Sequence, residues 1–345
     1  MPGLMKVARL YSFNDIRIED IPVPEVGQQD ALIKTAACGV CSGDVMPWYI
    51  EKKAPLVLGH EPAGEIVELG SSYVGSLRKG DRVFVHHHAP CLTCAYCLRG
   101  DYVQCETWRQ SRIVPGGISE FIIVPGTNLK NDTLILPAEV SFEDGTLVEP
   151  AACVVKSLRR SLIKKGDTVL IIGLGVMGQM HVLLARDFGA ERIIGVDMVP
   201  FRLEKALEFG ADHIIDVSKE DLTDGVHRIT KGRMADTVIV GPNSAKAMRQ
   251  GLATVAPGGT VLFFTPARPG ELLTVDPNEL YFKDVRISTS YSCGPDDTRE
   301  ALLFIQKGMV TAEKLVTHRY AIDETEKAYR LTAEAKTSLK SLIVF

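Results

Sequence analysis

Short apolar runs separated by glycine, proline and aspartate fill the first 150 residues of the chain. Runs of this kind, bounded by turn-forming residues, are typical of β-strands. The clearest of them read "ALIKTAAC", "GEIVELG", "DRVFVHH" and "EFIIVP". We therefore expect a β-rich region here.

The pattern changes near residue 166, where buried strands and amphipathic helices begin to alternate. The predicted strands read "DTVLIIG", "RIIGVD", "HIID", "ADTVIVG", "GTVLFFT" and "VRISTSY". A helix, "VMGQMHVLLARDFGA", ends at Gly189; the next, "PFRLEKALEFGAD", has Pro200 in its first turn and Gly210 at its end. Alternating strands and helices predict an α/β domain with a doubly wound parallel sheet.

The last 45 residues change character again. "DDTREALLFIQKG" and "DETEKAYRLTAEAK" are helical in pattern, and "SLIVF" reads as a strand. Their pattern alone does not assign them to either region.

Composition limits the classes of function. The 345 residues are 46% hydrophobic and 24% charged, which suits a globular protein of two domains. The net charge of −4 gives no reason to expect nucleic acid or an anionic membrane as partner. No apolar run is long enough to span a bilayer, and the first residues lack a signal-peptide pattern. A cytoplasmic location is the expectation.

The segment "GLGVMG" follows a predicted buried strand and opens a helix. Gly173 allows a tight turn, Gly175 lets the backbone approach a pyrophosphate, and Gly178 lets helix and strand pack closely. The helix begins with Val176 and Met177, whose N–H groups would face the phosphates. A glycine-rich turn in another kind of α/β protein is the alternative.

Asp197 ends the next predicted strand, where an acid accepts hydrogen bonds from the adenosine ribose. An aspartate there repels a 2′-phosphate, so the sequence favours NAD over NADP. Arg202 lies close by in sequence and could make NADP acceptable.

The segment "CLTCAYCLRGDYVQC" contains Cys91, Cys94, Cys97 and Cys105. Four thiolates from one short loop can close a tetrahedron around zinc and leave no open position, so the site would be structural. An iron–sulfur cluster is the main alternative, because such clusters also use closely spaced cysteines.

A second set of candidate ligands is dispersed along the chain: Cys41, His60, Glu61 and Glu149. One thiolate, one imidazole and a carboxylate would leave room on zinc for a substrate oxygen. Alternatively, His60 is a core residue and the two glutamates favour helix N-termini.

In its motifs and their order the chain resembles the zinc-containing medium-chain dehydrogenases, in the polyol and threonine dehydrogenase branch. The resemblance rests on "GHE", the four-cysteine lobe, "VEPA", "GLGVMG" and "LVTHRY". It implies a GroES-like β catalytic domain over 1–150 and 291–345, with the lobe at 86–108. A Rossmann NAD-binding domain would be inserted at 151–290. It also implies two zinc ions per chain, one of them catalytic and in the cleft between the domains.

In "AACGVCSGD" the family pattern fixes the register through Asp44, so the resemblance makes Cys41 the zinc ligand and Cys38 its neighbour. A redox dithiol is the alternative for "CGVC", but a β-rich context does not supply the helix that such a motif opens. The same resemblance makes His60 the second ligand. It leaves open whether Glu61 or Glu149 binds zinc at rest.

The chain departs from the family where a proton relay is usual. Gly43 replaces a serine or threonine and Met46 replaces a histidine. The run "HHH" at 86–88, in particular His87, is a candidate for a proton or substrate role. Trp48 and Tyr49 are candidates for the substrate pocket.

These features predict an enzyme that transfers a hydride reversibly from a secondary alcohol or polyol to NAD. The resemblance further implies a homodimer or homotetramer. One alternative is oxidation of an amino alcohol, as by L-threonine 3-dehydrogenase. Another is a catalytically silent NAD-binding protein, and a third, a zinc-free enone reductase, conflicts with Cys41, His60 and Asp197.

Overall fold

The computed structural model describes residues 3–345 and divides into two compact units. Unit 1 combines Met1–Ala152 with Cys293–Phe345, and unit 2 is Cys153–Ser292. From the sequence we expected boundaries at residues 150 and 290. The last segment of the chain, which pattern alone could not place, therefore belongs to unit 1.

Unit 2 is built on a six-stranded sheet in the order β11-β10-β9-β12-β13-β14, with every neighbouring pair parallel. The strands are β9 (Asp167–Ile172), β10 (Ala190–Asp197), β11 (His213–Asp216), β12 (Ala235–Val240), β13 (Val255–Phe263) and β14 (Arg286–Thr289). This order reverses direction at β9, as in dinucleotide-binding Rossmann folds. The predicted doubly wound sheet is confirmed.

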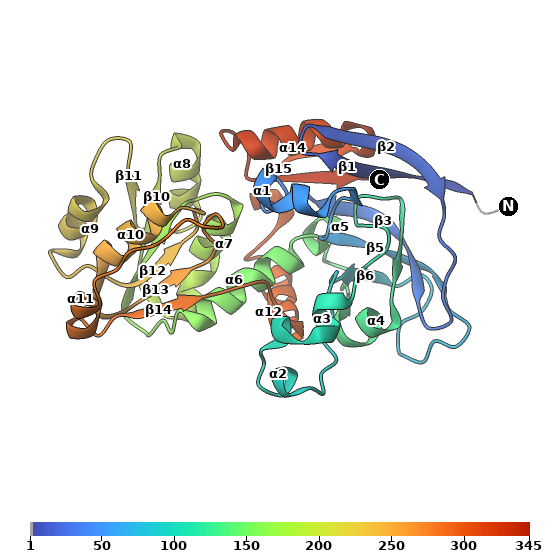
Figure 1. Cartoon of the computed structure of the whole chain (residues 1–345), viewed down its shortest axis with the longest axis horizontal. Helices are drawn as coiled ribbons and strands as arrows, with labels where there is room; N and C mark the ends of the chain where they lie inside the picture. Colours follow the sequence, from blue (N-terminus) through green and yellow to red (C-terminus); the bar gives the residue numbers. More distant parts are fainter. Residues whose placement is uncertain (1–2) are drawn as a thin grey trace. The chain divides into compact units, whose positions relative to one another are not determined.

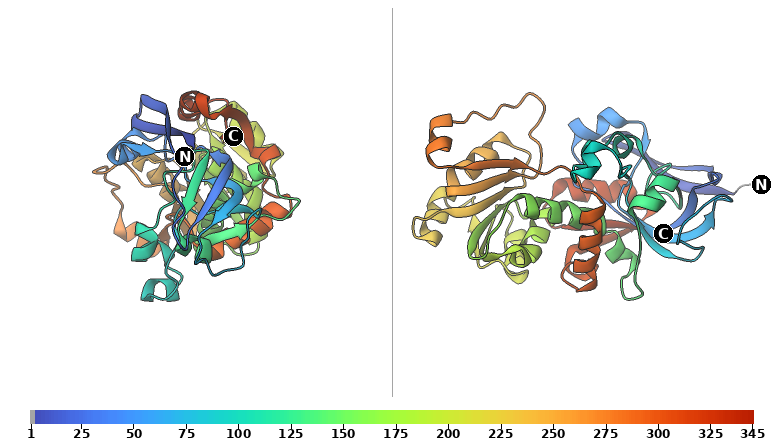
Figure 2. Two further views of the ribbon diagram at one scale, coloured as in Figure 1. Left: turned by 90° about the vertical axis from the view of Figure 1, so that its right-hand side faces the viewer. Right: turned by 90° about the horizontal axis from the view of Figure 1, so that it is seen from below.

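Helices lie on both faces of this sheet (Figures 1 and 2). They are α7 (Val176–Leu184), α8 (Pro200–Glu208), α9 (Leu222–Thr230), α10 (Ala245–Thr254) and α11 (Pro277–Phe282). Local chemistry explains their ends: Pro200 occupies the first turn of α8, and the Asp221 carboxylate accepts from the N–H groups of Thr223 and Asp224 at the start of α9. Strands β9, β12 and β13 each end in a largely buried apolar run, because helices cover both faces of the sheet.

Unit 1 contains two sheets. The smaller has the order β2-β1-β4, and the larger runs β15-β16-β3-β5-β6-β8 with β7 also paired to β3. Their strands are β1 (Leu4–Ser12), β2 (Asp15–Pro22), β3 (Ala31–Gly39), β4 (Leu56–Val57), β5 (Pro62–Leu69), β6 (Arg82–Val85), β7 (Phe121–Val124), β8 (Thr133–Ile135), β15 (Val316–Ala321) and β16 (Lys340–Val344). The predicted β-rich region is thus confirmed.

Short helices connect the strands of unit 1. They are α1 (Pro47–Ile50), α2 (Ala95–Leu98), α3 (Glu106–Gln110), α4 (Gly126–Asp132), α5 (Phe142–Gly145), α12 (Pro295–Gln306), α13 (Ala312–Leu315) and α14 (Thr325–Glu334). Helix α6 (Val148–Arg160) begins in unit 1 and continues into unit 2. The loop that carries α2 projects from the rest of unit 1 (Figure 1).

Each unit has its own apolar core. In unit 1 one cluster packs residues of β1 and β3 against Tyr329 of α14, and another lies between β3, β5 and β6. In unit 2 the core lies between the sheet and α9 and α10. Among residues 3–345, no helix combines the length and the apolar character needed to cross a bilayer.

Candidate metal centres and dinucleotide turn

The four cysteines of the loop over 91–105 converge. The sulfur atoms of Cys91, Cys94, Cys97 and Cys105 all lie within 4.8 Å of one another. Two of these separations are 3.9 Å, between Cys91 and Cys97, and 3.5 Å, between Cys94 and Cys97. A zinc ion with four sulfur ligands at about 2.3 Å requires edges of about 3.8 Å, so the cysteines fit a closed zinc site.

Hydrogen bonds from Thr93 and Cys94 support the thiolate form of Cys91. The N–H groups of Thr93 and Cys94 donate to the Cys91 sulfur over 3.5 and 3.3 Å. The Thr93 hydroxyl and N–H, followed by the Cys94 N–H, lower the pKa of Cys91 to about 5. Helix α2 starts directly after Cys94, which turns the chain so that Cys97 lies beside it. Trp108 packs in one cluster with these cysteines, of which Cys97 and Cys105 are buried.

A second group consists of Cys41, His60 and Glu61, whose ligand atoms also lie within 4.8 Å of one another. Strand pairing explains their convergence. Cys41 follows β3, His60 and Glu61 directly precede β5, and these antiparallel strands place Cys38 opposite Pro62. Side chains far apart in sequence are therefore held at one end of the same strand pair.

Asp44 orients the imidazole of His60. The Nδ1 atom of His60 lies 3.2 Å from Oδ2 of Asp44, which is a buried carboxylate. Carboxylates commonly hold metal-binding histidines in this way and leave Nε2 to the metal. Burial lowers the pKa of His60, but the charges of Asp44 and Cys41 outweigh it and hold the pKa well above its usual value. In the sequence Asp44 served only to fix the register, so this role was missed.

Gly43 and Met46, which replace the residues of the usual proton relay, are neighbours of Cys41 in the structure. The Gly43 N–H donates to the Cys41 sulfur over 3.3 Å. A Cβ atom at Gly43 would lie 3.4 Å from that sulfur and 3.9 Å from the Met46 methyl group. A side chain at this position would thus point at the sulfur, where Gly43 offers no hydroxyl. Cys38 is fully buried in β3, and burial raises its pKa to about 12, which does not suit a redox dithiol.

Glu61 has a buried partner that the sequence did not reveal. Its carboxylate forms an ion pair with the ammonium of Lys340, and both side chains are 1% exposed. Lys340 also donates to the carbonyl of Val40 over 3.1 Å. Burial raises the pKa of Glu61, although the Lys340 charge opposes this. A lysine that opens an apolar strand was the only available signal.

Glu149, expected beside Cys41, lies in a third group instead. Its carboxylate, the imidazole of His86 and the sulfur of Cys293 lie within 4.8 Å of one another, and all three residues are buried. Glu149 still acts electrostatically on Glu61, whose pKa it helps to raise. Neither His86 nor Cys293 was a candidate ligand in the sequence.

The three histidines at 86–88 have different surroundings. His86 is buried against Asp132, and His88 lies on Trp108 with ring centroids 4.2 Å apart. The ring of His87 lies 4.9 Å from that of His60. Its Nδ1 atom is buried and has no hydrogen-bond partner within residues 3–345. Of the three, His87 is the one beside the Cys41 group.

Trp48 and Tyr49 both belong to the short helix α1, and their ring centroids lie 5.9 Å apart. The indole Nε1 of Trp48 is buried and, in the described part of the chain, has no hydrogen-bond partner. The ammonium of Lys53 lies 3.8 Å from the centre of the Tyr49 ring, so this tyrosine already has a cation on one face.

The glycine turn has the geometry that a dinucleotide requires. Gly173 has φ of 88°, and a Cβ atom there would lie only 2.9 Å from Pro242. Gly178 packs so closely on the Gly173 carbonyl that no Cβ atom would fit. Helix α7 begins at Val176, directly after Gly175. The N–H groups of Val176 and Met177 are therefore in its first turn, where intrahelical acceptors are lacking.

Asp197 is the last residue of β10, and its side chain forms hydrogen bonds with the backbone of this turn. Its carboxylate accepts from the N–H groups of Leu174, Met198 and Val199 over 2.8, 2.8 and 3.0 Å. A carboxylate offers about four acceptor positions, so capacity for a ribose hydroxyl remains. Arg202 Nη1 lies 3.6 Å from Asp197 Oδ2. A Cβ atom at Gly175 would lie 3.9 Å from the Arg202 guanidinium, so this cation borders the turn.

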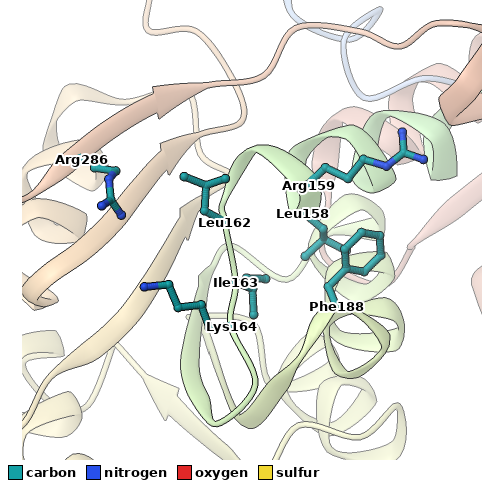
Figure 3. Close-up of a pocket in the computed structure, with 7 residues that line it drawn as sticks. All are labelled: Leu158, Arg159, Leu162, Ile163, Lys164, Phe188 and Arg286. Carbon is teal, nitrogen blue, oxygen red and sulfur yellow. The ribbon is translucent and has the colours of Figure 1, made fainter. Parts of the chain in front are cut away.

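Two surface hollows lie in unit 2. The first, of about 550 Å³, is lined by Leu158, Arg159, Leu162, Ile163, Lys164, Phe188 and Arg286 (Figure 3). None of these residues belongs to the glycine turn, so this hollow is not the dinucleotide site. The second, of about 490 Å³, is lined by Asn243, Ser244, Arg268 and Glu271. It follows the carboxyl ends of β12 and β13, where ligands of such sheets bind.

Comparison with known proteins decides the family. Residues 27–132 match the alcohol dehydrogenase GroES-like domain, and residues 176–307 match the zinc-binding dehydrogenase family. The chain belongs to the zinc-containing medium-chain dehydrogenases, in their polyol dehydrogenase branch. It is accordingly a zinc-dependent alcohol oxidoreductase that uses a nicotinamide dinucleotide, and the predicted GroES-like and Rossmann folds are confirmed.

Known dehydrogenases are similar to this chain over its whole length. Sorbitol dehydrogenase of Bombyx mori is 33% identical over 353 residues, which cover 97% of both chains. Sorbitol dehydrogenase of Bacillus subtilis is 30% identical and covers 100% of this chain and 98% of its own. Among solved structures, 2R,3R-butanediol dehydrogenase from Bacillus subtilis has a TM-score of 0.87 at 27% identity, covering 99% of each chain. A protein from Sinorhizobium meliloti 1021 bound to NADP has a TM-score of 0.88 at 27% identity, covering 99% of this chain and 100% of its own.

Proposed function

We propose that this dehydrogenase oxidises a secondary hydroxyl of a polyol to a ketone, reversibly, with NAD as the hydride acceptor. The observation that carries the proposal is the convergence of Cys41, His60 and Glu61, with His60 anchored by Asp44. Whole-length similarity to sorbitol dehydrogenases supports the substrate class. Thiolate, imidazole and carboxylate donors suit zinc, and three protein ligands leave a position for a substrate oxygen.

Zinc, when bound, supplies a Lewis acid that makes the substrate hydroxyl a better proton donor, and the nicotinamide supplies the hydride acceptor. Cys41, His60 and Glu61 would hold the metal. The Gly43 N–H donates to the Cys41 sulfur over 3.3 Å, and the Asp44 carboxylate would hold the His60 imidazole in the orientation that a metal ligand needs. Lys340 holds the Glu61 carboxylate in a fixed place.

Substrate hydroxyls would bind to polar atoms that lack partners in the described chain. His87 Nδ1 can accept a hydrogen bond beside His60, and Trp48 Nε1 can donate one. A polyol carries several hydroxyls, so two such atoms suit it better than they suit a simple alcohol. We propose Trp48, Tyr49 and His87 as the substrate pocket on this ground.

On unit 2, Gly173, Gly175 and Gly178 would bind the pyrophosphate together with the N–H groups of Val176 and Met177. Asp197 would accept from the adenosine ribose. Its negative charge disfavours a 2′-phosphate, so we propose that NAD is preferred. Arg202, whose guanidinium borders the turn, is the residue through which some NADP would be accepted.

The activity test measures NADH formation by its absorbance at about 340 nm. The substrates tested are polyols, inositols, simple alcohols and L-threonine. We expect turnover of polyols, loss of turnover in Cys41→Ser, and retention in Cys38→Ser, whose thiol is buried in β3. Preferential turnover of L-threonine would replace the substrate class with an amino alcohol. No turnover of any alcohol by zinc-loaded protein would overturn the proposal.

We also propose two zinc ions for these two sites, with the lobe ion structural. Metal analysis should find that Cys41→Ser keeps the lobe ion and that Cys94→Ser loses it. Because four thiolates enclose that ion, its loss should lower the free energy of unfolding as well. A lobe metal with an iron–sulfur absorption spectrum would contradict the assignment to zinc.

A homodimer or homotetramer in the cytoplasm stays part of the proposal. Strand β14 is at one end of the sheet order of unit 2, and it carries Ile287, which is 43% exposed. Tyr281 and Phe282, in the preceding helix α11, are 79% and 78% exposed. Exposed apolar side chains next to an edge strand are typical of an association surface. Light scattering coupled to size-exclusion chromatography tests this, and a monomer would contradict it.

A further inference from the structure

A buried group in unit 1 has the composition of a metal site but belongs to neither proposed zinc position. It consists of His86, Glu149 and Cys293, whose ligand atoms lie within 4.8 Å of one another. The three residues are 0%, 6% and 0% exposed. We infer that these side chains bind a divalent transition metal, zinc or a chemically similar ion, in addition to the two positions of the proposed function.

The imidazole of His86 is held in the orientation that a metal ligand needs. Its Nδ1 atom lies 2.6 Å from Oδ2 of Asp132, and the other oxygen of Asp132 accepts from the Thr298 hydroxyl over 2.5 Å. Because the Asp132 carboxylate acts as acceptor, Nδ1 of His86 carries the proton. The lone pair of Nε2 is then available to a metal, which is the usual arrangement of carboxylate-supported metal-binding histidines.

The backbone of His86 is fixed by the same helix. The His86 N–H donates to the Asp132 carbonyl over 3.2 Å, and the Asn128 side chain donates to the His86 carbonyl over 3.0 Å. Both partners belong to α4. His86 itself follows β6, so one helix fixes both its main chain and its ring. A site built on rigid elements in this way holds its ligand atoms in place.

The distances match a tetrahedral ion. His86 Nε2 lies 3.7 Å from the Cys293 sulfur. Zinc with nitrogen at about 2.05 Å and sulfur at about 2.3 Å requires a separation of about 3.6 Å. A hydrogen bond between thiol and imidazole would explain this one distance. The Cys293 sulfur also lies 3.9 Å from the carbonyl oxygen of Glu149, so Cys293 contacts both other members of the group.

The charges around the group favour a cation. The carboxylate of Glu149 acts electrostatically on the buried carboxylate of Glu61, and the ammonium of Lys340 forms an ion pair with Glu61. With Cys293 as a thiolate, the buried negative charges would exceed the charge of that lysine. A divalent ion bound by His86, Glu149 and Cys293 offsets this excess.

The donor types select the metal. One thiolate, one imidazole and one carboxylate suit zinc and cobalt(II), whereas magnesium and calcium prefer oxygen ligands alone. The ring of His87 lies 5.1 Å from that of His86 and 4.9 Å from that of His60. The third metal position is therefore a neighbour of the catalytic one and separate from it, and its three ligands come from three segments of unit 1.

Cobalt(II) is the probe, because a cobalt–thiolate bond absorbs in the near ultraviolet. The Cys41→Ser variant, with zinc in the lobe, has lost the thiolate of the catalytic position. We expect it still to acquire a cobalt–thiolate band. The band should vanish in Cys41→Ser/Cys293→Ser and persist in the matched control Cys41→Ser/Cys38→Ser, whose second cysteine is buried outside all three groups.

Asp132→Asn, in the Cys41→Ser background, tests the support of His86. Loss of such a carboxylate lowers metal affinity by roughly 10- to 100-fold, and the cobalt titration should shift by that factor. Unfolding midpoints of all variants verify that they are folded. The inference is wrong if Cys41→Ser binds no cobalt through sulfur, or if its band survives Cys293→Ser. Turnover of alcohols by the wild-type protein is measured separately, so this test of the third metal position does not decide the proposed function.

Discussion

The ammonium of Lys340 and the carboxylate of Glu61 form an ion pair in which each side chain is only 1% exposed. Lys340 opens β16, and Glu61 directly precedes β5, so the two charges are brought together by strands on either side of β3. Removing one partner of a buried pair leaves the other charge without compensation.

We predict that Lys340→Met lowers the free energy of unfolding of the zinc-loaded protein by about 3 kcal/mol or more. The double variant Lys340→Met/Glu61→Gln should recover a large part of this loss, because no uncompensated carboxylate remains. Denaturant unfolding measures both, with Lys34→Met, an exposed lysine of β3, as control. Equal stability of Lys340→Met and Lys34→Met would contradict the prediction.

The second prediction concerns the carboxylate that orients His60. Asp44→Asn keeps the shape of the side chain but weakens the hydrogen bond to Nδ1 of His60. Zinc affinity at the Cys41 position should fall by roughly 10- to 100-fold, as expected when such a support is lost. Competition with a chromophoric chelator measures this, and the lobe zinc should be unaffected. Asp20→Asn, at an exposed position of β2, is the control and should bind zinc as the wild type does.

The third prediction concerns the choice between NAD and NADP. Asp197→Asn removes the negative charge that opposes a 2′-phosphate and releases Arg202 from its carboxylate neighbour at 3.6 Å. The ratio of kcat/KM for NADP to that for NAD should rise by about tenfold or more, equivalent to about 1.4 kcal/mol. Asp187→Asn, an exposed acid of unit 2, should leave the ratio unchanged. An unchanged ratio in Asp197→Asn would show that the dinucleotide is selected elsewhere.

The fourth prediction is a pH dependence of stability in unit 2. His181 is buried in α7, donates from Nδ1 to the Met177 carbonyl over 2.7 Å, and has a pKa lowered by burial to about 4. In the unfolded chain its pKa is about 6.5, so between these values the unfolded state binds more protons. The stability held by neutral His181 is therefore complete above about pH 6.5 and is lost as the pH falls toward 4, by roughly 3 kcal/mol in all.

Guanidinium unfolding at about pH 7.5 and about pH 5 measures this effect. The wild type should lose about 2 kcal/mol more over this interval than His181→Gln, which does not titrate. His227→Gln removes an exposed histidine and should behave as the wild type. A pH dependence shared equally by wild type and His181→Gln would refute the assignment to this residue.

Local spacing explains what the sequence predicted well. The strands of unit 2, the turn at Gly173 and the convergence of Cys91 with Cys105 depend on residues close together in the chain. Convergence over long separations was not predictable in the same way. Cys293 meets His86 only because the last segment returns to unit 1, and Lys340 meets Glu61 only because β16 pairs with β3.

Glu149 illustrates why residue type alone was insufficient. A carboxylate suits both the Cys41 group and the group with His86, and only the course of α6 places it with the latter. The role of Asp44 was likewise not predictable from residue type. Its position was evident, but its hydrogen bond to His60 depends on how the chain turns after β3.

The pairing of β16 with β3 also sets an order of events during synthesis. Strand β3 is made early, whereas β16 follows the whole of unit 2 along the chain. On the ribosome, the edge of β3 that pairs with β16 stays unpaired while unit 2 is synthesised and folds as a unit of its own. The buried charge of Glu61 is neutralised only when β16 arrives, so the metal centre is among the last parts of the molecule to mature.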